Sequence, residues 1–274
     1  MADHQILIVG GGAAGIATAA SLHKRDASLD IAIIEPSTTH YYQPGWTMVG
    51  AGVFKKEETA RSMASVMPSY VTQIRGTVAS FQPDENNVKL EDGKALTYGS
   101  LVVAAGLKLD WAAIEGLEEA LGRNGVTSNY RYDLAPYTWE LVQKMRGEKA
   151  IFTQPPMPIK CAGAPQKAMY LSCSTWMQVG KIKDIDVSFC NAGPVLFGCA
   201  DYVPPLMEYV DRYGINLDFG YNLVKVDGPN QIATFKVAKE GEDPRLVERK
   251  FDMLHVCPPQ CAPDFIKDSP LANE

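Results

Sequence analysis

The chain has 274 residues, of which 46% are hydrophobic and 21% are charged, a composition typical of a folded protein with one large or two ordinary domains. Its net charge of −6, without any basic run, disfavours nucleic-acid binding. No stretch approaches about 18 continuous apolar residues, and the N-terminus resembles neither a signal nor a transit peptide, so the sequence predicts no membrane-spanning helix and no export.

The start of the chain predicts a βαβ unit that binds a dinucleotide. Two continuous apolar runs, typical of buried parallel strands, flank a glycine turn and a helical segment. Gly10, Gly12 and Gly15 fit the pattern G-x-G-x-x-G, in which the glycines allow a tight turn, close approach of a pyrophosphate, and close packing of helix on strand. Glu35 follows at the end of the second strand, where a carboxylate accepts hydrogen bonds from a ribose.

Residues 37–52 then read as a loop whose aromatic side chains belong mainly to the core. Residues 71–106 predict strands and hairpins, with a turn at Asp92-Gly93. The last of these strands ends at Gly106, and in flavoproteins with two dinucleotide domains the end of such a strand approaches the flavin. We therefore expect a first, dinucleotide-binding domain over residues 1–110, and the resemblance described below implies that its ligand is FAD.

Residues 111–150 predict a helical return segment, and residues 151–274 a second domain of the nucleotide-binding type. After its first apolar strand, a second glycine motif is expected, but "PPMPIKCAGAPQ" (residues 155–166) stands there instead. Prolines supply no amide donors for a phosphate, so NAD(P)H binding is disfavoured. The next helix is expected to begin near Pro165. The predicted fold is α/β, with two Rossmann-like domains, the second lacking the NAD motif.

Cys161 is the candidate catalytic residue. It stands before a predicted helix N-terminus and beside Lys160, and both features favour a thiolate. It also follows a strand end, where α/β proteins bind ligands. The alternative is a buried, inert thiol.

The other cysteines divide into two groups. A structural disulfide framework is not expected in a chain of this kind. Cys173 and Cys190 are expected in the core, whereas Cys199, Cys257 and Cys261 stay open as redox partners of Cys161. The C-x3-C pair lacks further ligands of suitable spacing, so no metal site is predicted. The four histidines form no triad-like arrangement and are expected to be structural.

These segments resemble the sulfide:quinone oxidoreductases, in particular the bacterial and mitochondrial branch in which no cysteine anchors the flavin covalently. The similarity covers almost the whole chain and is carried by "VGGGAAGIATAASL", "HYYQPGWTMVGAG", "LVVAAGLKLDW", "PIKCAGAPQKAMYLS" and "MLHVCPPQCAPDFIKDSPLA". The stretches "HYYQPGWT" and "KCAGAPQK" separate this family from general NADH dehydrogenases. The resemblance implies a glutathione-reductase-like flavoprotein fold.

The resemblance also implies the chemistry. Sulfide would be oxidised to sulfane sulfur through a persulfide on Cys161, one of two redox cysteines, and electrons would pass through FAD to a membrane quinone. The expected FAD contacts are Gly10, Gly12, Ala13, Ala14, Gly15, Glu35, Gln43, Val78 and Gly106. The implied partners are sulfide, a sulfur acceptor and quinone, and the implied location is peripheral to the inner membrane, on its cytoplasmic side.

The sequence departs from the family in its C-terminal part. Family members continue with a G-D-containing strand, a second redox cysteine, most of the quinone pocket and amphipathic membrane helices, none of which is found here. We therefore expect a C-terminally truncated form, such as a fragment or a frameshifted gene product, with membrane contact in the missing part. The alternatives are a shortened protein that uses another of its cysteines, a non-catalytic FAD-binding remnant, and a flavocytochrome-type sulfide dehydrogenase flavoprotein, which is disfavoured because those proteins are exported.

Overall fold

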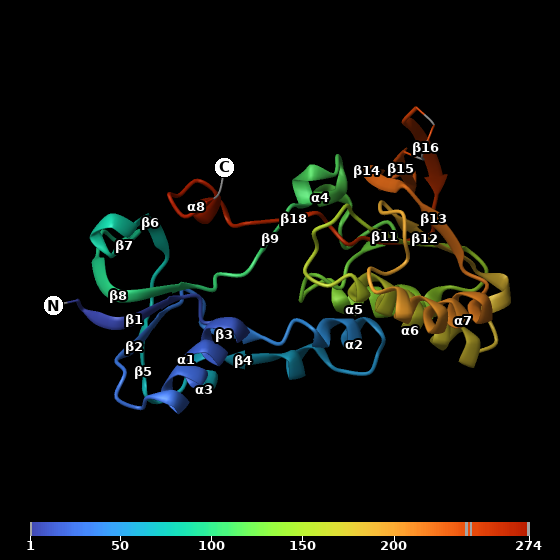
Figure 1. Ribbon diagram of the computed structural model, residues 1–274. Coiled ribbons are helices and arrows are strands. Elements are labelled where there is room, and N and C mark those ends of the chain that lie inside the picture. The colour runs from blue at the N-terminus through green and yellow to red at the C-terminus, as the bar shows by residue number, and fades with distance from the viewer. Residues whose placement is uncertain (1, 239–240, 242, 273–274) are drawn as a thin grey trace. The chain divides into compact units, whose positions relative to one another are not determined.

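The computed structural model describes residues 2–238, 241 and 243–272, and the chain forms two compact units (Figure 1). Both units contain parallel strands joined by helices, as an α/β fold of Rossmann type requires. Unit 1 comprises residues 1–41, 60–108 and 261–274, and unit 2 comprises residues 42–59 and 109–260.

This division differs from the expected series of continuous segments in two places. Residues 42–59 belong to unit 2, where Trp46 and Val49 pack against Ala135. The last segment, from residue 261, belongs to unit 1, where the ring of Phe265 stacks on that of Phe81 with 5.9 Å between centroids. Contacts between residues far apart in the chain decide both assignments.

Unit 1 is built on a six-stranded sheet in the order β5-β2-β1-β8-β7-β6. The strands β5, β2, β1 and β8 are parallel, and β6, β7 and the start of β8 pair antiparallel. In chain order, the strands of the whole unit, including β3 and β4 outside this sheet, are β1 (His4–Val9), β2 (Ile31–Ile34), β3 (Thr39–Tyr41), β4 (Ala60–Ser62), β5 (Val71–Ile74), β6 (Val78–Gln82), β7 (Asn87–Leu90) and β8 (Ala95–Val103). The helices of unit 1 are α1 (Ala13–Arg25), α3 (Met63–Val66) and α8 (Asp264–Lys267). The predicted turn at Asp92-Gly93 is confirmed, with Gly93 at φ +88° between β7 and β8.

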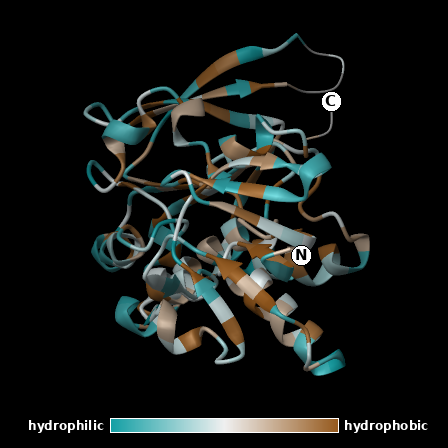
Figure 2. Cartoon of the chain, turned by 90° about the vertical axis from the view of Figure 1, so that its left-hand side faces the viewer, coloured by the Kyte–Doolittle hydropathy of each residue, from teal (hydrophilic) through white to brown (hydrophobic). Residues whose placement is uncertain are grey.

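Both faces of this sheet are covered, which explains the continuous apolar runs of its central strands. Ile8 and Ile33 pack against Ala19 of α1 on one face. Leu7 packs with Phe81 in a second cluster on the other face. Hydrophobic residues, brown in Figure 2, accordingly lie along many of the strands, whereas many outer turns are hydrophilic and drawn in teal.

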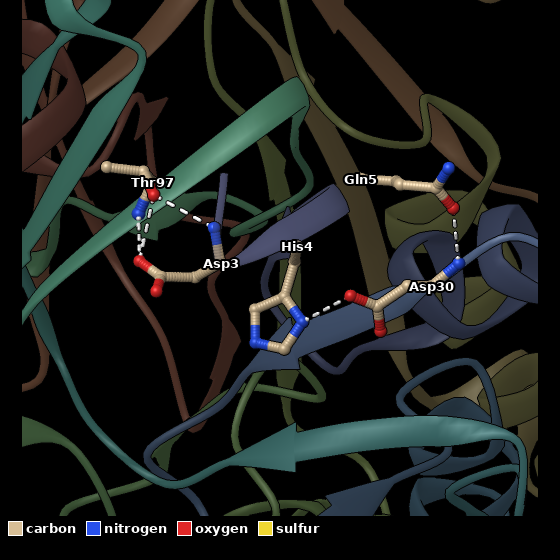
Figure 3. Close-up of polar contacts among 5 residues, drawn as sticks. All are labelled: Asp3, His4, Gln5, Asp30 and Thr97. Atoms are coloured by element: carbon tan, nitrogen blue, oxygen red, sulfur yellow. Dashed lines mark hydrogen bonds and ion pairs between the residues drawn. The ribbon is translucent and has the colours of Figure 1, made fainter. Parts of the chain in front are cut away.

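Side chains join β1 to both of its neighbours at the amino end of the sheet (Figure 3). The backbone N–H of Asp3 donates to Thr97 Oγ1 at 2.9 Å, and the N–H of Thr97 donates back to Asp3 Oδ2 at 2.8 Å. On the other side, His4 Nδ1 lies 2.9 Å from Asp30 Oδ2, and the N–H of Asp30 donates to Gln5 Oε1 at 2.8 Å. These contacts lie at the end of the strands opposite to their carboxyl ends, and they accompany the backbone pairing of β1 with β2 and β8.

Unit 2 is built on a five-stranded parallel sheet in the order β10-β17-β11-β12-β13, with a three-stranded antiparallel sheet, β14-β15-β16, beside it. Its strands are β10 (Val126–Thr127), β11 (Lys149–Gln154), β12 (Asp186–Asn191), β13 (Asn216–Phe219), β14 (Tyr221–Asp227), β15 (Ile232–Val237), β16 (Arg245–Lys250) and β17 (Met253–His255), and its helices are α2 (Gly45–Gly50), α4 (Leu117–Ala120), α5 (Ala135–Lys144), α6 (Gly163–Gln178) and α7 (Val203–Tyr213). The short strands β9 (Lys108–Leu109) and β18 (Gln260–Cys261) stand where the chain passes between the units.

Helices pack on one face of the parallel sheet in unit 2, and the antiparallel sheet packs on the other face. Phe152 of β11 packs with Trp176 of α6, and Figure 1 shows α5, α6 and α7 together on this side of β11 and β12. Ile151 points to the other face and packs with Phe235 of β15. The predicted core positions of Cys173 and Cys190 are confirmed, since both are buried. None of the described helices has both the length and the apolar character needed to cross a bilayer.

Candidate functional site

In unit 1, the carboxyl ends of β2, β1 and β8 meet at one edge of the sheet. The N–H of Gly10, just after β1, donates to the carbonyl of Ile34 at 2.9 Å. The N–H of Ala104, just after β8, donates to the carbonyl of Val9 at 2.7 Å. Three elements that are distant in sequence therefore place Gly10, Glu35 and the segment leading to Gly106 along one edge, where parallel α/β sheets bind ligands.

The glycine turn has the geometry that its motif predicts. Gly10 has φ +105°, a left-handed conformation that glycine adopts without strain. A Cβ on Gly15 would lie 1.9 Å from the carbonyl oxygen of Gly10, so helix α1 can pack this closely only with glycine there. A Cβ on Gly12 would meet nothing within 4 Å, so the backbone at the start of α1 is open to a ligand. Ala13 and Ala14, the first residues of α1, are exposed.

Glu35 fixes the turn and stays available for a ligand. Its Oε2 accepts the N–H of Gly11 at 2.8 Å, and its Oε1 accepts the N–H of Ser37 at 2.7 Å. Each carboxylate oxygen has a second lone pair, so the half-buried side chain retains acceptor capacity for a hydroxyl. The open amides and this carboxylate together fit a dinucleotide such as FAD.

The remaining expected FAD contacts lie in different surroundings. Gly106 has φ +76°, and a Cβ there would meet nothing within 4 Å. Val78 is buried in β6 among core residues of unit 1. Gln43 belongs to unit 2 and lines the pocket described next. A role in cofactor binding stays a prediction for all of them.

Unit 2 contains a pocket of about 170 Å³ that includes the candidate catalytic cysteine, and we call it the thiol pocket. Its lining residues are Gln43, Pro44, Trp46, Thr47, Asn129, Tyr130, Lys160, Cys161, Ala164 and Lys167. Cys161 is half-buried and lies in the eight-residue connection, residues 155–162, between β11 and α6. The sequence prediction that Cys161 precedes a helix is thereby confirmed.

Helix α6 begins at Gly163, two residues before the expected start at Pro165. The N–H of Ala164 donates to the carbonyl of Cys161 at 3.1 Å and closes the first turn. Pro165 is tolerated inside this turn because the first four amides of a helix have no intrahelical acceptor. The earlier start brings the Cys161 backbone to the helix end, where the helix dipole favours negative charge.

Lys160 is held beside the pocket by three contacts. Its ammonium donates to Gln43 Oε1 at 2.6 Å and lies 5.8 Å from the ring centroid of Tyr130. Its backbone N–H donates to Gln260 Oε1 at 2.6 Å. Desolvation lowers the pKa of Lys160, and interactions with the thiolates of Cys161 and Cys257 oppose that shift. The residue as a whole remains exposed, so its contacts rather than burial define its position.

A buried histidine supports the loop that contributes Asn129 and Tyr130 to the pocket. The Nε2 atom of His255, at the end of β17, accepts the backbone N–H of Asn129 at 3.0 Å. Because His255 is fully buried, desolvation lowers its pKa to about 4, and the imidazole is neutral near pH 7. The expected structural role of this histidine is thus supported by its contact, which positions residues 128–130.

The side-chain amide of Asn129, which lines the thiol pocket, is buried and lacks hydrogen bonds within the described part of the chain. The hydroxyl of Tyr130 is also buried, and it neighbours the Cys257 thiol, whose pKa it lowers. Gly50 permits the position of Asn129, since a Cβ there would lie 2.3 Å from Oδ1. Buried polar groups are costly when unpaired, so this arrangement suits a small ligand with polar or anionic character.

Sequence reasoning missed several residues of this pocket. Asn129, Tyr130 and Gln260 carry no motif that a single sequence reveals, and their positions depend on the order of strands in unit 2. No group of three or more histidine, cysteine, aspartate or glutamate residues is placed to hold a metal ion among the residues that the structure describes.

Comparison with known proteins supports both the fold and the family. Residues 4–140 match the family described as pyridine nucleotide-disulphide oxidoreductase. The chain is 40% identical over 272 residues to "Sulfide:quinone oxidoreductase, mitochondrial" of Dictyostelium discoideum, and 37% identical over 270 residues to the protein of that name from Mus musculus. These alignments cover 98% of this chain but 59% and 60% of the relatives, so the chain spans about three fifths of their length.

Solved structures agree with the expected fold. The sulfide:quinone oxidoreductase of Aquifex aeolicus matches with a TM-score of 0.81 and 20% identity, over 97% of this chain and 61% of that chain. NDH2 from Plasmodium falciparum matches with a TM-score of 0.69 and 13% identity, over 97% of this chain and 57% of that chain. The predicted α/β fold of Rossmann type is confirmed.

Proposed function

The chain belongs to the pyridine nucleotide-disulphide oxidoreductase family, and we propose that it carries the sulfide-oxidising chemistry of a flavin-dependent sulfide:quinone oxidoreductase. One observation carries the proposal: after the first long strand of unit 2, a loop with Lys160 and Cys161 stands where a nucleotide-binding turn would be. The names of the relatives from Dictyostelium and mouse support the same substrate and acceptor.

We assign the FAD to the carboxyl edge of the sheet in unit 1. Gly10 and Gly12 would let the pyrophosphate reach the amides at the start of α1, and Glu35 would accept a ribose hydroxyl. When bound, FAD supplies a two-electron acceptor that can pass its electrons to a quinone. The open space at Gly12 and the spare acceptor capacity of Glu35 support this assignment.

We assign the sulfur chemistry to Cys161. Its thiolate is the reactive form, and the ammonium of Lys160 and the amide end of α6 both stabilise negative charge there. Sulfide would be oxidised by two electrons to the sulfane level and held as a Cys161 persulfide, and the two-electron acceptor that this requires is the chemistry that bound FAD would supply. Asn129 and Tyr130 would then give the entering sulfide polar partners.

The remaining parts of the proposal rest on the resemblance and on the names of the relatives. They are the quinone as final electron acceptor, a sulfur acceptor that removes the persulfide, and attachment to the cytoplasmic face of an inner membrane. The relatives are longer than this chain. On the resemblance, we assign the segments that would bind quinone and membrane to that additional length.

The test is an anaerobic titration of the FAD-loaded chain with sulfide, followed by the flavin absorbance. We expect bleaching in the wild type and in Cys199→Ser, a control that removes an exposed thiol, and no bleaching in Cys161→Ser. Equal bleaching in the wild type and Cys161→Ser would show that the role given to Cys161 is wrong. Absence of bleaching in all three would favour a non-catalytic FAD-binding remnant. Fast reduction by NADH would contradict the assignment of the 155–162 loop.

A further inference from the structure

The structure brings a second cysteine to the same edge of unit 2 as Cys161. Strands β10, β17 and β11 are adjacent and parallel, so the segments that follow them emerge side by side. Tyr130 comes three residues after β10, Cys257 two residues after β17, and the Cys161 loop after β11. The loops that hold the two cysteines are tied directly, because the N–H of Lys160 donates to Gln260 Oε1.

Burial and a backbone hydrogen bond hold Cys257 at this edge of the sheet. It is 1% exposed, and its backbone N–H donates to Thr153 Oγ1 of β11 at 3.3 Å. Burial raises the pKa of the Cys257 thiol to about 12, while the neighbouring Tyr130 hydroxyl and Lys160 ammonium lower it. Charge on the Cys161 sulfur raises the pKa of Cys257 further, and both sulfurs act electrostatically on Lys160 and Tyr130, so these four groups are neighbours.

The two other buried cysteines of unit 2, Cys173 and Cys190, interact with neither Cys161 nor the Lys160 ammonium. Cys173 is fully buried on α6 among apolar side chains, and burial raises its pKa to about 12 without a neighbouring cation. Cys190 lies in β12, where Arg249 Nη1 donates to its sulfur at 3.8 Å. Among the described cysteines of unit 2, Cys257 is the one whose interactions include both Cys161 and the Lys160 ammonium.

We propose that Cys257 is the sulfur partner of Cys161 in this chain, and that the two form a disulfide that sulfide reopens. The inference rests on the proposed function, because it supplies the second sulfur that sulfide oxidation at Cys161 requires. A low-molecular-weight disulfide, RSSR, serves as oxidant: the Cys161 thiolate displaces one RS− and forms a mixed disulfide. The first RS− then takes the proton of Cys257, and the Cys257 thiolate attacks the Cys161 sulfur and releases the second RS−.

The second step takes two electrons from sulfide. HS− attacks the Cys161 sulfur, which is the accessible one, and the S–S bond breaks with Cys257 as the leaving thiolate. Cys161 keeps the new sulfur as a persulfide, and Cys257 takes up a proton, since burial favours its neutral form. The sulfide sulfur is oxidised by two electrons and the disulfide is reduced by two.

The experiment treats the reduced, purified full chain with 2,2′-dithiodipyridine and follows each cysteine by peptide mass spectrometry. In the wild type, a Cys161–Cys257 linked peptide should form and the mixed adduct on Cys161 should disappear. In Cys257→Ala and Cys257→Ser, the mixed adduct should persist at least about ten times longer. Cys173→Ala, which removes an equally buried thiol, should behave as the wild type. Circular dichroism establishes that each variant is folded.

A second measurement adds sulfide to the oxidised wild type, which should give a persulfide on Cys161 and a free thiol on Cys257. A stable mixed adduct on Cys161 in the wild type would overturn the proposed pair, and so would linkage of Cys161 to Cys199 or Cys261. Neither result would contradict the role of Cys161 in sulfide oxidation, which the flavin titration tests separately. A Cys161 that fails to react at all would overturn the pair and the proposed function together.

Discussion

Each unit of this chain has a strand, a turn and a helix in the same order, yet the two turns differ in length and composition. In unit 1, three residues separate β1 from α1, and all three are glycine. In unit 2, eight residues separate β11 from α6, and they include prolines, a lysine and a cysteine. The comparison teaches that one framework presents either open backbone amides or a cysteine side chain, depending on the length and composition of this turn.

Loops at the two sheet edges are also supported in different ways, namely the glycine turn in unit 1 and, in unit 2, the loop after β10 that carries Asn129. In unit 1, Glu35 at the end of the neighbouring strand accepts the N–H of Gly11. In unit 2, His255 at the end of β17, next to β11, accepts the N–H of Asn129. A strand-end side chain fixes a backbone amide in both units, but one support is a half-buried carboxylate and the other a buried neutral imidazole. The predictions below act on these differences.

The largest effect should come from Gly15→Ala in the first turn. Its Cβ would collide with the backbone oxygen of Gly10, so α1 must move away from β1. We expect a loss of about 3 kcal/mol in the free energy of unfolding and loss of FAD binding. Urea unfolding and fluorescence titration with FAD measure the two effects.

Gly12→Ala is the matched control for that substitution. Its Cβ meets no protein atom, so stability should change by less than about 0.5 kcal/mol. FAD affinity should nevertheless fall at least about tenfold, roughly 1.4 kcal/mol, because the methyl group enters the space proposed for the pyrophosphate. Equal FAD affinity for Gly12→Ala and the wild type would contradict the assignment of the turn.

The imidazole support should make unit 2 sensitive to acid. His255 is neutral when folded and has a depressed pKa of about 4, whereas an unfolded histidine has a pKa of about 6.5. The unfolded state therefore binds more protons between these values, and stability falls as the pH is lowered from about 6.5 to about 4. The full shift corresponds to about 3 kcal/mol.

The variant His255→Gln isolates this contribution. Glutamine can accept the Asn129 N–H through its amide oxygen but does not titrate. The difference in unfolding free energy between wild type and variant should therefore depend on pH only in this window. A parallel pair of stability curves from pH 4 to 7 would show that the imidazole is not held neutral.

A smaller effect is expected from Lys160→Met in the second turn. The variant removes the ammonium that interacts with the thiolate of Cys161. The rate of Cys161 alkylation by iodoacetamide at pH 7 should fall about three- to tenfold, which corresponds to about 1 kcal/mol. Lys183→Met, which changes the net charge equally at an exposed position, should leave the rate unchanged. An equal loss in both variants would indicate a general charge effect.

The smallest effect should come from Gln43→Ala. The amide oxygen of Gln43 accepts a hydrogen bond from the Lys160 ammonium, so its loss frees the lysine without removing the charge. We expect alkylation of Cys161 to slow by about twofold, within the range of one exposed hydrogen bond. A loss as large as that in Lys160→Met would mean that Gln43 acts on the thiol by another route.

Local sequence patterns determined the first turn almost completely. Gly10, Gly15 and Glu35 lie within one βαβ unit, and their roles follow from sterics that act over a few residues. The same kind of reasoning placed Cys161 before a helix and found that a phosphate turn is absent there. It also placed the start of α6 near Pro165, and the helix begins at Gly163 with this proline in its first turn.

Only the tertiary structure decided what surrounds Cys161. Asn129, Tyr130 and Cys257 reach the thiol pocket or its edge because β10 and β17 are inserted beside β11, and strand order is not encoded in any local pattern. The same holds for residues 42–59, which join unit 2 through contacts of α2 with α5. Local sterics act between neighbours in sequence, whereas a pocket between strand ends depends on long-range pairing that a single sequence leaves open.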